Sequence, residues 1–390
     1  MSESDKGIIA IAKRELRRIF SSKICIFGML IAPILSVVIL VSMMKPGLPT
    51  KIPIVVVDLD NSGTSRNLVR QLNGFSKTEI KYKTANFEEA RDMMERWDVY
   101  AILSIPKGFE RDANLGNNPK LVFYTNNAFL VTGSLVFQDL KTISVLASAS
   151  VNLKVGTAKG IAPTQLMPIV QPISIESHPI SNPWLNYSIY LNSVICPALL
   201  HLIILLFTVS AIGCEVKAGT GQRLMNMGGG SITKVMLGKL LPYTAIFMLY
   251  ALLIMSILYH YNNFPLKGSF FVVYLNYVCM ILAAQSLGVI FISLFKNYRF
   301  ALSIASLFGM VSFSIAGLSF PVLAMDPMLQ ALSSLFPLRH FFLIYVDQSL
   351  NGIPFGYSAY RFAILLSFVL VSLFFWRGAK TFLSRNTYED

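Results

Sequence analysis

The chain has 390 residues, of which 54% are hydrophobic and only 14% charged, and its mean hydropathy is +0.59. This composition is unlike that of soluble globular domains and indicates a membrane protein. The formal net charge of +13 would suit nucleic-acid binding, but the excess lies mostly in short connections between apolar runs. We therefore expect no nucleic-acid partner.

Six apolar runs are long enough to cross a bilayer, which takes about 20 helical residues. They cover residues 24–44, 189–214, 237–259, 270–295, 301–323 and 362–376. We expect an α-helical polytopic membrane protein with six transmembrane helices and an inserted α/β (α+β) extracytoplasmic domain. The expected parts are an interface helix at 1–23, a first span at 24–44, the inserted domain at 45–187 and a five-helix transmembrane domain at 188–390.

The segment that precedes the first run, IIAIAKRELRRIFSSK, has the pattern of an amphipathic helix. One side carries Ile8, Ile11, Ala12, Glu15 and Ile19, and another carries Lys13, Arg14, Arg17 and Arg18. Such a helix lies in the membrane interface, so we expect its basic side chains to face anionic lipid. The run after it has no small-residue cleavage pattern, and we expect it to remain as an anchor.

Lysine and arginine are distributed unevenly among the connections. They concentrate before the first run, after the second, between the fourth and fifth, and after the last. The connection after the third run has only Lys267, and residues 324–360 have only Arg339. By the positive-inside rule both termini are cytoplasmic and the inserted domain lies outside the cell membrane.

Apolar stretches alternate with helical patterns inside the inserted domain. Strands are predicted at 51–57, 79–83, 99–105 and 120–124, and helices at 64–73, from Asn86 onward and at 129–157. This order predicts a partly parallel sheet covered by helices, with a last strand at 169–175. In the second helix we expect Phe87, Ala90, Met94 and Trp97 to share a face. All four cysteines lie in or beside the apolar runs, so this domain has no disulfide.

The first predicted strand ends in VVVDLDNSGTS, which raises the question of carboxylate chemistry. A phosphatase would use Asp58 as nucleophile and Asp60 as acid, but it also needs a later acidic pair to hold magnesium, and none is evident. A calcium loop would need a bidentate Glu where Val69 stands. We therefore expect a turn whose Asp60, Asn61 and Ser62 accept backbone hydrogen bonds and start the next helix.

The connection after the second run, residues 215–236, has a pattern of its own. A short helical piece at 215–227 is followed by three glycines and by Ser231, which would cap the next helix. This pattern predicts a small helical projection into the cytosol, and a plain connecting loop is the alternative.

Together these features resemble the ABC-2 type permeases, the integral-membrane subunits of ATP-binding cassette exporters, over essentially the whole chain. The family's DxDNSxxS motif is matched by Asp58, Asp60, Asn61, Ser62 and Ser65. Its pattern after the second span is matched by Glu215, Gly219, Thr220, Leu224, Gly238 and Lys239. Its later motifs are matched by Gly317, Phe320, Pro321, Pro337, Leu338, Arg339 and Gly352. The chain departs from the family at 228–230, where many relatives have a proline.

The resemblance implies that the 215–236 segment is a coupling loop seated in a separate ABC ATPase subunit. The residues carried over for this coupling are Glu215, Gly219, Thr220, Arg223, Leu224 and Lys239. Further implied partners are a second permease chain, identical or related, a periplasmic adaptor protein and membrane lipids, in a bacterial inner membrane. The chain has no GxxxxGK[ST] loop. We therefore expect a permease that is not itself an enzyme and holds no cofactor, with ATP and Mg bound by the partner subunit.

Polar residues inside the runs are the candidates for a substrate pathway. They are Asn192, His201, Gln285, Ser306 and Ser312. None of the runs has a charge at its centre, where one would cost about 2.5 to 3.5 kcal/mol, so an amphipathic or lipid-like substrate fits better than an ion. The alternative is that these groups only hydrogen-bond neighbouring helices.

The connection at 321–358 is too apolar for a free loop and is interrupted by Pro327, Pro337 and Pro354. We expect two short helices that re-enter the outer leaflet there. For the whole chain, two other function classes remain as alternatives to an exporter subunit. These are a membrane-anchored phosphatase that uses Asp58 and Asp60, and a sensor whose outer domain binds a ligand.

Overall fold

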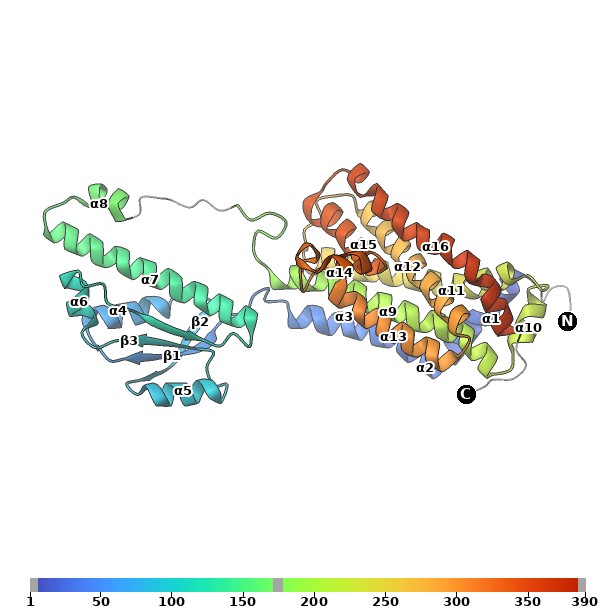
Figure 1. The fold of residues 1–390 in the computed structure, drawn as a ribbon, viewed down its shortest axis with the longest axis horizontal. Coiled ribbons are helices and arrows are strands. Elements are labelled where there is room, and N and C mark those ends of the chain that lie inside the picture. The colour runs from blue at the N-terminus through green and yellow to red at the C-terminus, as the bar shows by residue number, and fades with distance from the viewer. Residues whose placement is uncertain (1–5, 171–177, 385–390) are drawn as a thin grey trace. The chain divides into compact units, whose positions relative to one another are not determined.

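The structure is a computed structural model that describes residues 6–170 and 178–384. The chain divides into two compact units (Figure 1). The helical unit comprises Met1–Gly47 and Pro179–Asp390, and the sheet unit comprises Leu48–His178. Because the sheet unit is an insertion, the chain leaves the helical unit once and returns to it once. At that point the backbone N–H of Tyr187 donates to the carbonyl oxygen of Gly47 over 2.6 Å.

The helical unit begins with α1 (Ile8–Ser21), α2 (Lys23–Cys25), a π-helical turn (Ile26–Ile31) and α3 (Ala32–Met43). After the insertion follow α9 (Tyr187–Lys217), α10 (Gly221–Met227), α11 (Ile232–Met255) with a π-helical turn (Ser256–Tyr261), α12 (Phe270–Phe295) and α13 (Tyr298–Ile315). The last elements are a 3₁₀ turn (Val322–Ala324), α14 (Pro327–Ser333), α15 (Pro337–Tyr345), a π-helical turn (Val346–Asn351) and α16 (Phe355–Leu383).

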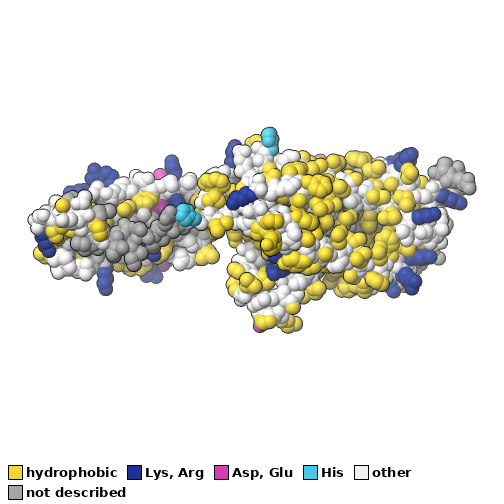
Figure 2. Space-filling view, turned by 90° about the horizontal axis from the view of Figure 1, so that it is seen from above, with side chains coloured by type: hydrophobic (Ala, Val, Ile, Leu, Met, Phe, Trp, Pro, Cys, Tyr) yellow, Lys and Arg dark blue, Asp and Glu magenta, His cyan; other side chains and the backbone are white. Residues whose placement is uncertain are grey.

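Seven helices among the described residues are long and apolar enough to cross a membrane. Six of them overlap the six predicted runs: Lys23–Met43, Tyr187–Lys217, Ile232–Tyr261, Phe270–Phe295, Tyr298–Ile315 and Phe355–Leu383. The seventh is α7 (Leu130–Ala158), which belongs to the sheet unit. Figure 2 shows hydrophobic side chains over much of the visible face of the helical unit. The chain is therefore a polytopic membrane protein, as its composition indicates.

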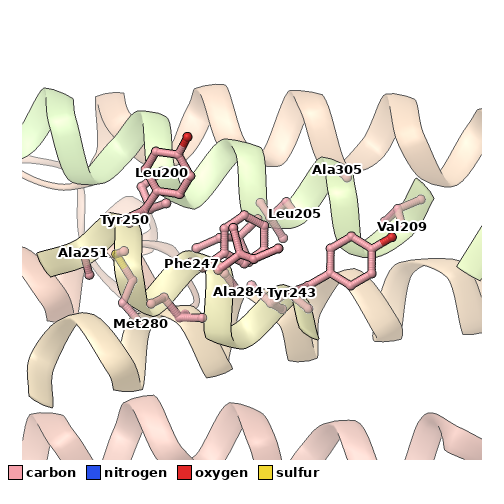
Figure 3. Close-up of a cluster of buried hydrophobic side chains, with 14 of the residues drawn as sticks. Leu200, Leu205, Val209, Tyr243, Phe247, Tyr250, Ala251, Met280, Ala284 and Ala305 are labelled. Atoms are coloured by element: carbon pink, nitrogen blue, oxygen red, sulfur yellow. The ribbon is translucent and has the colours of Figure 1, made fainter. Parts of the chain in front are cut away.

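The core of the helical unit lies between α9, α11, α12 and α13. Leu200, Leu205 and Phe247 interdigitate there with Met280 and Ala284 (Figure 3). Small residues bring the helices close together, since an added Cβ on Gly288 would lie 2.8 Å from the Thr208 side chain. This packing makes α9 and α12 the most buried of the candidate spans.

The segment that we predicted to re-enter the membrane is a bent pair of short helices. Residues Pro327–Ser333 and Pro337–Asn351 meet at 85°. The second of them packs on α12, where the ring of Phe341 meets Tyr277 edge to face, with centroids 4.7 Å apart. The Asn276 side chain donates to the Phe341 carbonyl over 2.9 Å and holds this contact.

The sheet unit has four strands in the order β2-β1-β3-β4. Its elements are β1 (Ile52–Asp58), α4 (Gly63–Leu72), β2 (Thr78–Thr84), α5 (Phe87–Glu95), β3 (Ala101–Ile105), α6 (Phe109–Leu115), β4 (Val122–Thr125), α7 and α8 (Pro163–Val170). Strand β1 pairs in parallel with β2 and β3, and β4 is antiparallel to β3. The partly parallel sheet that the sequence predicts is therefore present.

Strand β1 is buried on both faces, which explains its continuous β-branched sequence. On one face Ile54 and Val56 pack with α4 and with Val136 and Leu140 of α7. On the other face Val55 and Val57 pack with α5 through Ala90. Since its apolar residues meet the sheet, α7 is part of the core of this unit.

Two details of the sheet unit differ from the sequence predictions, and a third lies mostly outside the described residues. Trp97 does not share the buried face of α5, because it follows the end of the helix with a φ of +67° and is 55% exposed. Helix α6 was not predicted. Most of the strand expected at 169–175 lies outside the described residues, and Ile169 belongs to α8.

Candidate functional site

Charged side chains are buried at the end of the helical unit where α1, α10 and the start of α11 lie (Figure 1). Glu15 of α1, Glu215 of α9 and Lys239 of α11 have no exposed surface. Together with Arg14, Arg18 and Thr220 they form a connected set of hydrogen bonds and ion pairs, which we call the charge network. Buried charges are costly unless they are paired, so this arrangement is the most distinctive chemistry in the helical unit.

Glu215 is the centre of the charge network. Its Oε2 accepts hydrogen bonds from Arg14 Nη2 at 2.7 Å and from the Thr220 hydroxyl at 2.6 Å. Its Oε1 accepts from Arg18 Nη1 at 2.7 Å and from Lys239 Nζ at 2.9 Å. Four donors from α1, α11 and the connection before α10 therefore satisfy one carboxylate.

Lys239 joins the two buried acids. Its ammonium donates to Glu15 Oε1 at 2.7 Å as well as to Glu215. The other oxygen of Glu15 lies 3.5 Å from the Tyr243 hydroxyl, and Arg14 Nη1 is 3.9 Å from Oε1. Glu15 therefore depends mainly on Lys239, whereas Glu215 has three other donors.

Close packing of α1 on α11 makes this geometry possible. The face of α1 that carries Ile11, Glu15 and Ile19 is buried, as expected for residues four apart on a helix. It meets α11 at Gly238, where an added Cβ would lie 2.8 Å from both the Ile8 carbonyl oxygen and Cβ of Ile11. A glycine next to Lys239 thus lets the two helix backbones approach.

Helix α10 is attached to the charge network and to both neighbouring helices. The N–H of Thr220 donates to the Glu215 carbonyl at 2.8 Å, and the N–H of Gly7 donates to the Met227 carbonyl at 2.9 Å. Gly219 adopts a φ of +65°, a left-handed conformation that turns the chain from α9 into α10. Leu224 is buried, while Gln222, Arg223 and Asn226 are exposed. The polar face of α10 is therefore available to a partner.

The structure places the predicted coupling residues in two groups. Glu215, Thr220 and Lys239 meet in the charge network, and Gly219, Arg223 and Leu224 belong to α10 or the turn before it. Glu215 lies in the last turn of α9, inside the protein. Arg14 and Arg18, which we expected to face lipid, instead bind Glu215. The sequence feature that could have indicated that α1 is buried in the protein is Glu15, an acidic residue on the apolar side of the helix.

The predicted pathway residues are dispersed. Asn192 and His201 are fully buried in α9. Ser312 donates to the Phe308 carbonyl of its own helix, and Ser306 is partly exposed on the same helix. Gln285 of α12 lines a cavity of 170 Å³ together with residues of α11 and α16. The described residues of this group therefore do not form a single polar path.

Asp58, the last residue of β1, and Asp60 build the expected turn. Of the expected acceptors, Asp60 and Ser62 accept from backbone N–H groups, whereas Asn61 Oδ1 accepts from the Arg66 side chain at 3.4 Å. Asp58 Oδ1 accepts from the N–H groups of Asp60 and Asn61, and its Oδ2 accepts from the Ser65 hydroxyl. The Ser62 hydroxyl caps α4 by accepting from the N–H of Ser65.

Asp60 connects this turn to α6, because its Oδ2 accepts from the N–H of Glu110 at 3.1 Å. Its slight burial acts to raise the pKa, but hydrogen bonds with Ser62 and with the backbone of residues 108–110 outweigh it and lower the pKa below the ordinary value. Among the described residues no three His, Cys, Asp or Glu side chains are placed to hold a metal ion.

Comparison with known proteins identifies the chain at the family level. A search of curated proteins finds no match. The family described as ABC-2 family transporter protein matches residues 23–377, which reach from the start of the first candidate span into the last one and include the sheet unit. Its members are transmembrane subunits and not the ATPase itself. With its polytopic fold and a match over most of its length, the chain belongs to the ABC-2 transporter family.

Proposed function

We propose that this chain is the transmembrane subunit of an ATP-driven exporter that moves an amphipathic or lipid-like substrate out of the cytoplasm or the inner membrane. Separate ABC ATPase subunits bind ATP and Mg, and a second permease chain, identical or related, completes the transporter. The observation that carries the proposal is the charge network, because it joins an exposed cytosolic helix to the transmembrane core.

The proposed coupling runs from α10 into the membrane helices. The ATPase contacts the exposed face of α10, which carries Gln222, Arg223 and Asn226. Thr220 connects α10 to Glu215 of α9, and Lys239 continues the contact into α11. Since paired buried charges resist separation, a displacement of α10 moves these helices as a unit and changes access to the pathway.

Charge distribution supports the proposed orientation. Lys and Arg side chains gather at the end of the helical unit where α1 and α10 lie (Figure 2). The positive-inside rule places that end, with both termini, in the cytoplasm, and puts the sheet unit outside the membrane. There the sheet unit receives substrate or docks an adaptor protein.

The nature of the pathway residues supports the proposed substrate class. Asn192, Gln285 and Ser312 offer hydrogen bonds without fixed charge inside largely apolar helices. Such surroundings accept a molecule with a long apolar part and a few polar groups. Ions and sugars would lose more hydration than these groups restore.

A reversal of charge on α10 tests the proposal. The chain is co-expressed with an ABC ATPase encoded by a neighbouring gene, and co-purification and ATP-dependent export of a fluorescent lipid analogue are measured in vesicles. Arg223→Glu should reduce both, whereas Lys141→Glu, an exposed site in the sheet unit, should leave both unchanged. Unaltered ATPase binding and export in Arg223→Glu would contradict the assignment of α10.

One observation favours a sensor as the second candidate function. The sheet unit has a cavity of 620 Å³ whose lining includes Arg66, Arg70 and Lys83. A cleft with three cations could bind an anionic ligand outside the membrane. A sensor needs no ATPase, so stable co-purification with one, together with ATP-dependent export, decides against this alternative.

A further inference from the structure

The cavity of 170 Å³ in the helical unit lies among three candidate spans. Leu237, Leu241 and Thr244 of α11, Gln285 of α12, and Val369 and Trp376 of α16 are among its lining residues. Most of the surface that it presents is apolar. Leu237 and Leu241 are 41% and 51% exposed on the outside of the helical unit, so the cavity adjoins the surface that these spans present to lipid.

Two polar groups at the cavity have no partner among the described residues. They are the amide nitrogen of Gln285 and Nε1 of Trp376, and both atoms are buried. The Gln285 side chain is only 3% exposed, and its carbonyl oxygen already faces the Thr244 hydroxyl at 2.8 Å. A buried polar group without a partner is costly. The indole N–H can only donate, so the missing partner is an acceptor.

The position of the cavity along the helices identifies the acceptor. It is lined by the first turns of α11 and by the last turns of α16, which lie at the basic end of the helical unit. Lys380 is four residues beyond Trp376 on the same face of α16, and Lys234 is three residues before Leu237 on α11. Both lysines are exposed. Gln285 faces Thr244 at the deeper end of the cavity, Trp376 lies nearer the basic end, and the two lysines follow toward the membrane surface.

A phospholipid has the matching order of groups. Its acyl chain is apolar, its ester carbonyls accept hydrogen bonds, and its phosphate is anionic. We propose that the cavity binds the first several carbons of one acyl chain of an anionic phospholipid from the cytoplasmic leaflet. An ester carbonyl accepts from Trp376 Nε1, Lys234 and Lys380 attract the headgroup, and the acyl chain extends from there toward Gln285. This site is distinct from the charge network. It shares Gln285 with the proposed pathway, but lipid binding there is measured without export.

Fluorescence of Trp376 measures occupancy directly. The chain has three tryptophans, and Trp97→Phe with Trp184→Phe leaves only Trp376. This full-length variant is reconstituted in phosphatidylcholine bilayers that contain a small fraction of lipid brominated on its acyl chains. Brominated phosphatidylglycerol should quench Trp376 at several-fold lower membrane content than brominated phosphatidylcholine.

Three further variants test the two halves of the site. Gln285→Met replaces the unpartnered amide at the deeper end by an apolar group of similar volume and should strengthen the binding of both lipids, because the acyl chain then meets no unpaired donor. Lys234→Gln and Lys380→Gln, at the exposed end, should each weaken the binding of phosphatidylglycerol about fivefold and leave quenching by phosphatidylcholine unchanged. Equal quenching by both lipids, or protection of Trp376 from both, would overturn the proposal. If Gln285→Met fails to fold, the lysine variants still decide it.

Discussion

Replacement of Lys239 by methionine tests the charge network most directly. Lys239 Nζ lies 2.7 Å from Glu15 and 2.9 Å from Glu215, and all three side chains are fully buried. The substitution keeps the length of the side chain but removes its charge. Glu215 keeps its hydrogen bonds from Arg14, Arg18 and Thr220, so the carboxylate that loses its main partner is Glu15.

The expected cost follows from that asymmetry. Breaking a buried ion pair by removing one partner costs about 3–5 kcal/mol, because the remaining charge is uncompensated. Replacing both partners by apolar residues of similar volume is often neutral or stabilising. Lys239→Met should therefore lower the free energy of unfolding by about 3–5 kcal/mol, and adding Glu15→Met should restore most of this loss.

Both effects are measurable on the full chain in detergent. Helical circular dichroism during denaturation gives the stability of the wild type, the two single variants and the double variant, which form a double-mutant cycle. If the single and double variants are equally unstable, or if Lys239→Met costs less than about 1 kcal/mol, the buried pairing is not what the structure implies. The stable double variant should still export poorly, because the ion pairs that join α11 to Glu15 of α1 and Glu215 of α9 are lost.

Three other perturbations have specific expected outcomes. Gly238→Ala should destabilise the packing of α1 on α11 by about 1–3 kcal/mol, measured by thermal unfolding against Gly356→Ala, whose added Cβ meets nothing within 4 Å. Asp58→Ala with Asp60→Ala should increase hydrogen exchange in α4 and α6 without changing any phosphatase activity, with or without magnesium, and a loss of such activity would restore the catalytic interpretation. Because the folded-state pKa of Asp60 is lowered, it stabilises the sheet unit above its unfolded pKa and loses this effect as pH falls through the folded pKa. Hydrogen exchange of α6 should therefore rise with acidification in the wild type and change less in Asp60→Asn, and identical pH profiles would refute that role.

The elements of the fold are largely visible in the sequence because each depends on local pattern. The β-branched run 52–57 has the composition of a strand buried on both faces, and the spans follow from uninterrupted apolar length. Helix α6 escapes prediction because seven residues with three charges, FERDANL, give little periodic signal. Its place is fixed by Asp60 and by the burial of Phe109 against the sheet.

Only some residues of the charge network could be predicted from the sequence, and the reason is different. Family resemblance singles out Glu215 and Lys239, but their partners Arg14, Glu15 and Arg18 lie about 200 residues away along the chain. An interface helix and a buried one have the same amphipathic pattern, so pattern alone cannot show that α1 packs against α11 and binds Glu215 of α9. The position of Glu15 on the apolar face of α1 is explained only by its ion pair with Lys239.

The hydrogen bond between Gly47 and Tyr187 has a consequence for how such a protein can be altered. The chain leaves the helical unit after Gly47, returns to it at Pro179 and then passes Gly47 again at Tyr187, where nitrogen and oxygen are 2.6 Å apart. A tight turn of a few residues could close that gap. The intervening segment can therefore be removed, lengthened or exchanged for another folded module without moving either helix end. The same closeness would have allowed evolution to change this part of the protein independently of the transmembrane machinery.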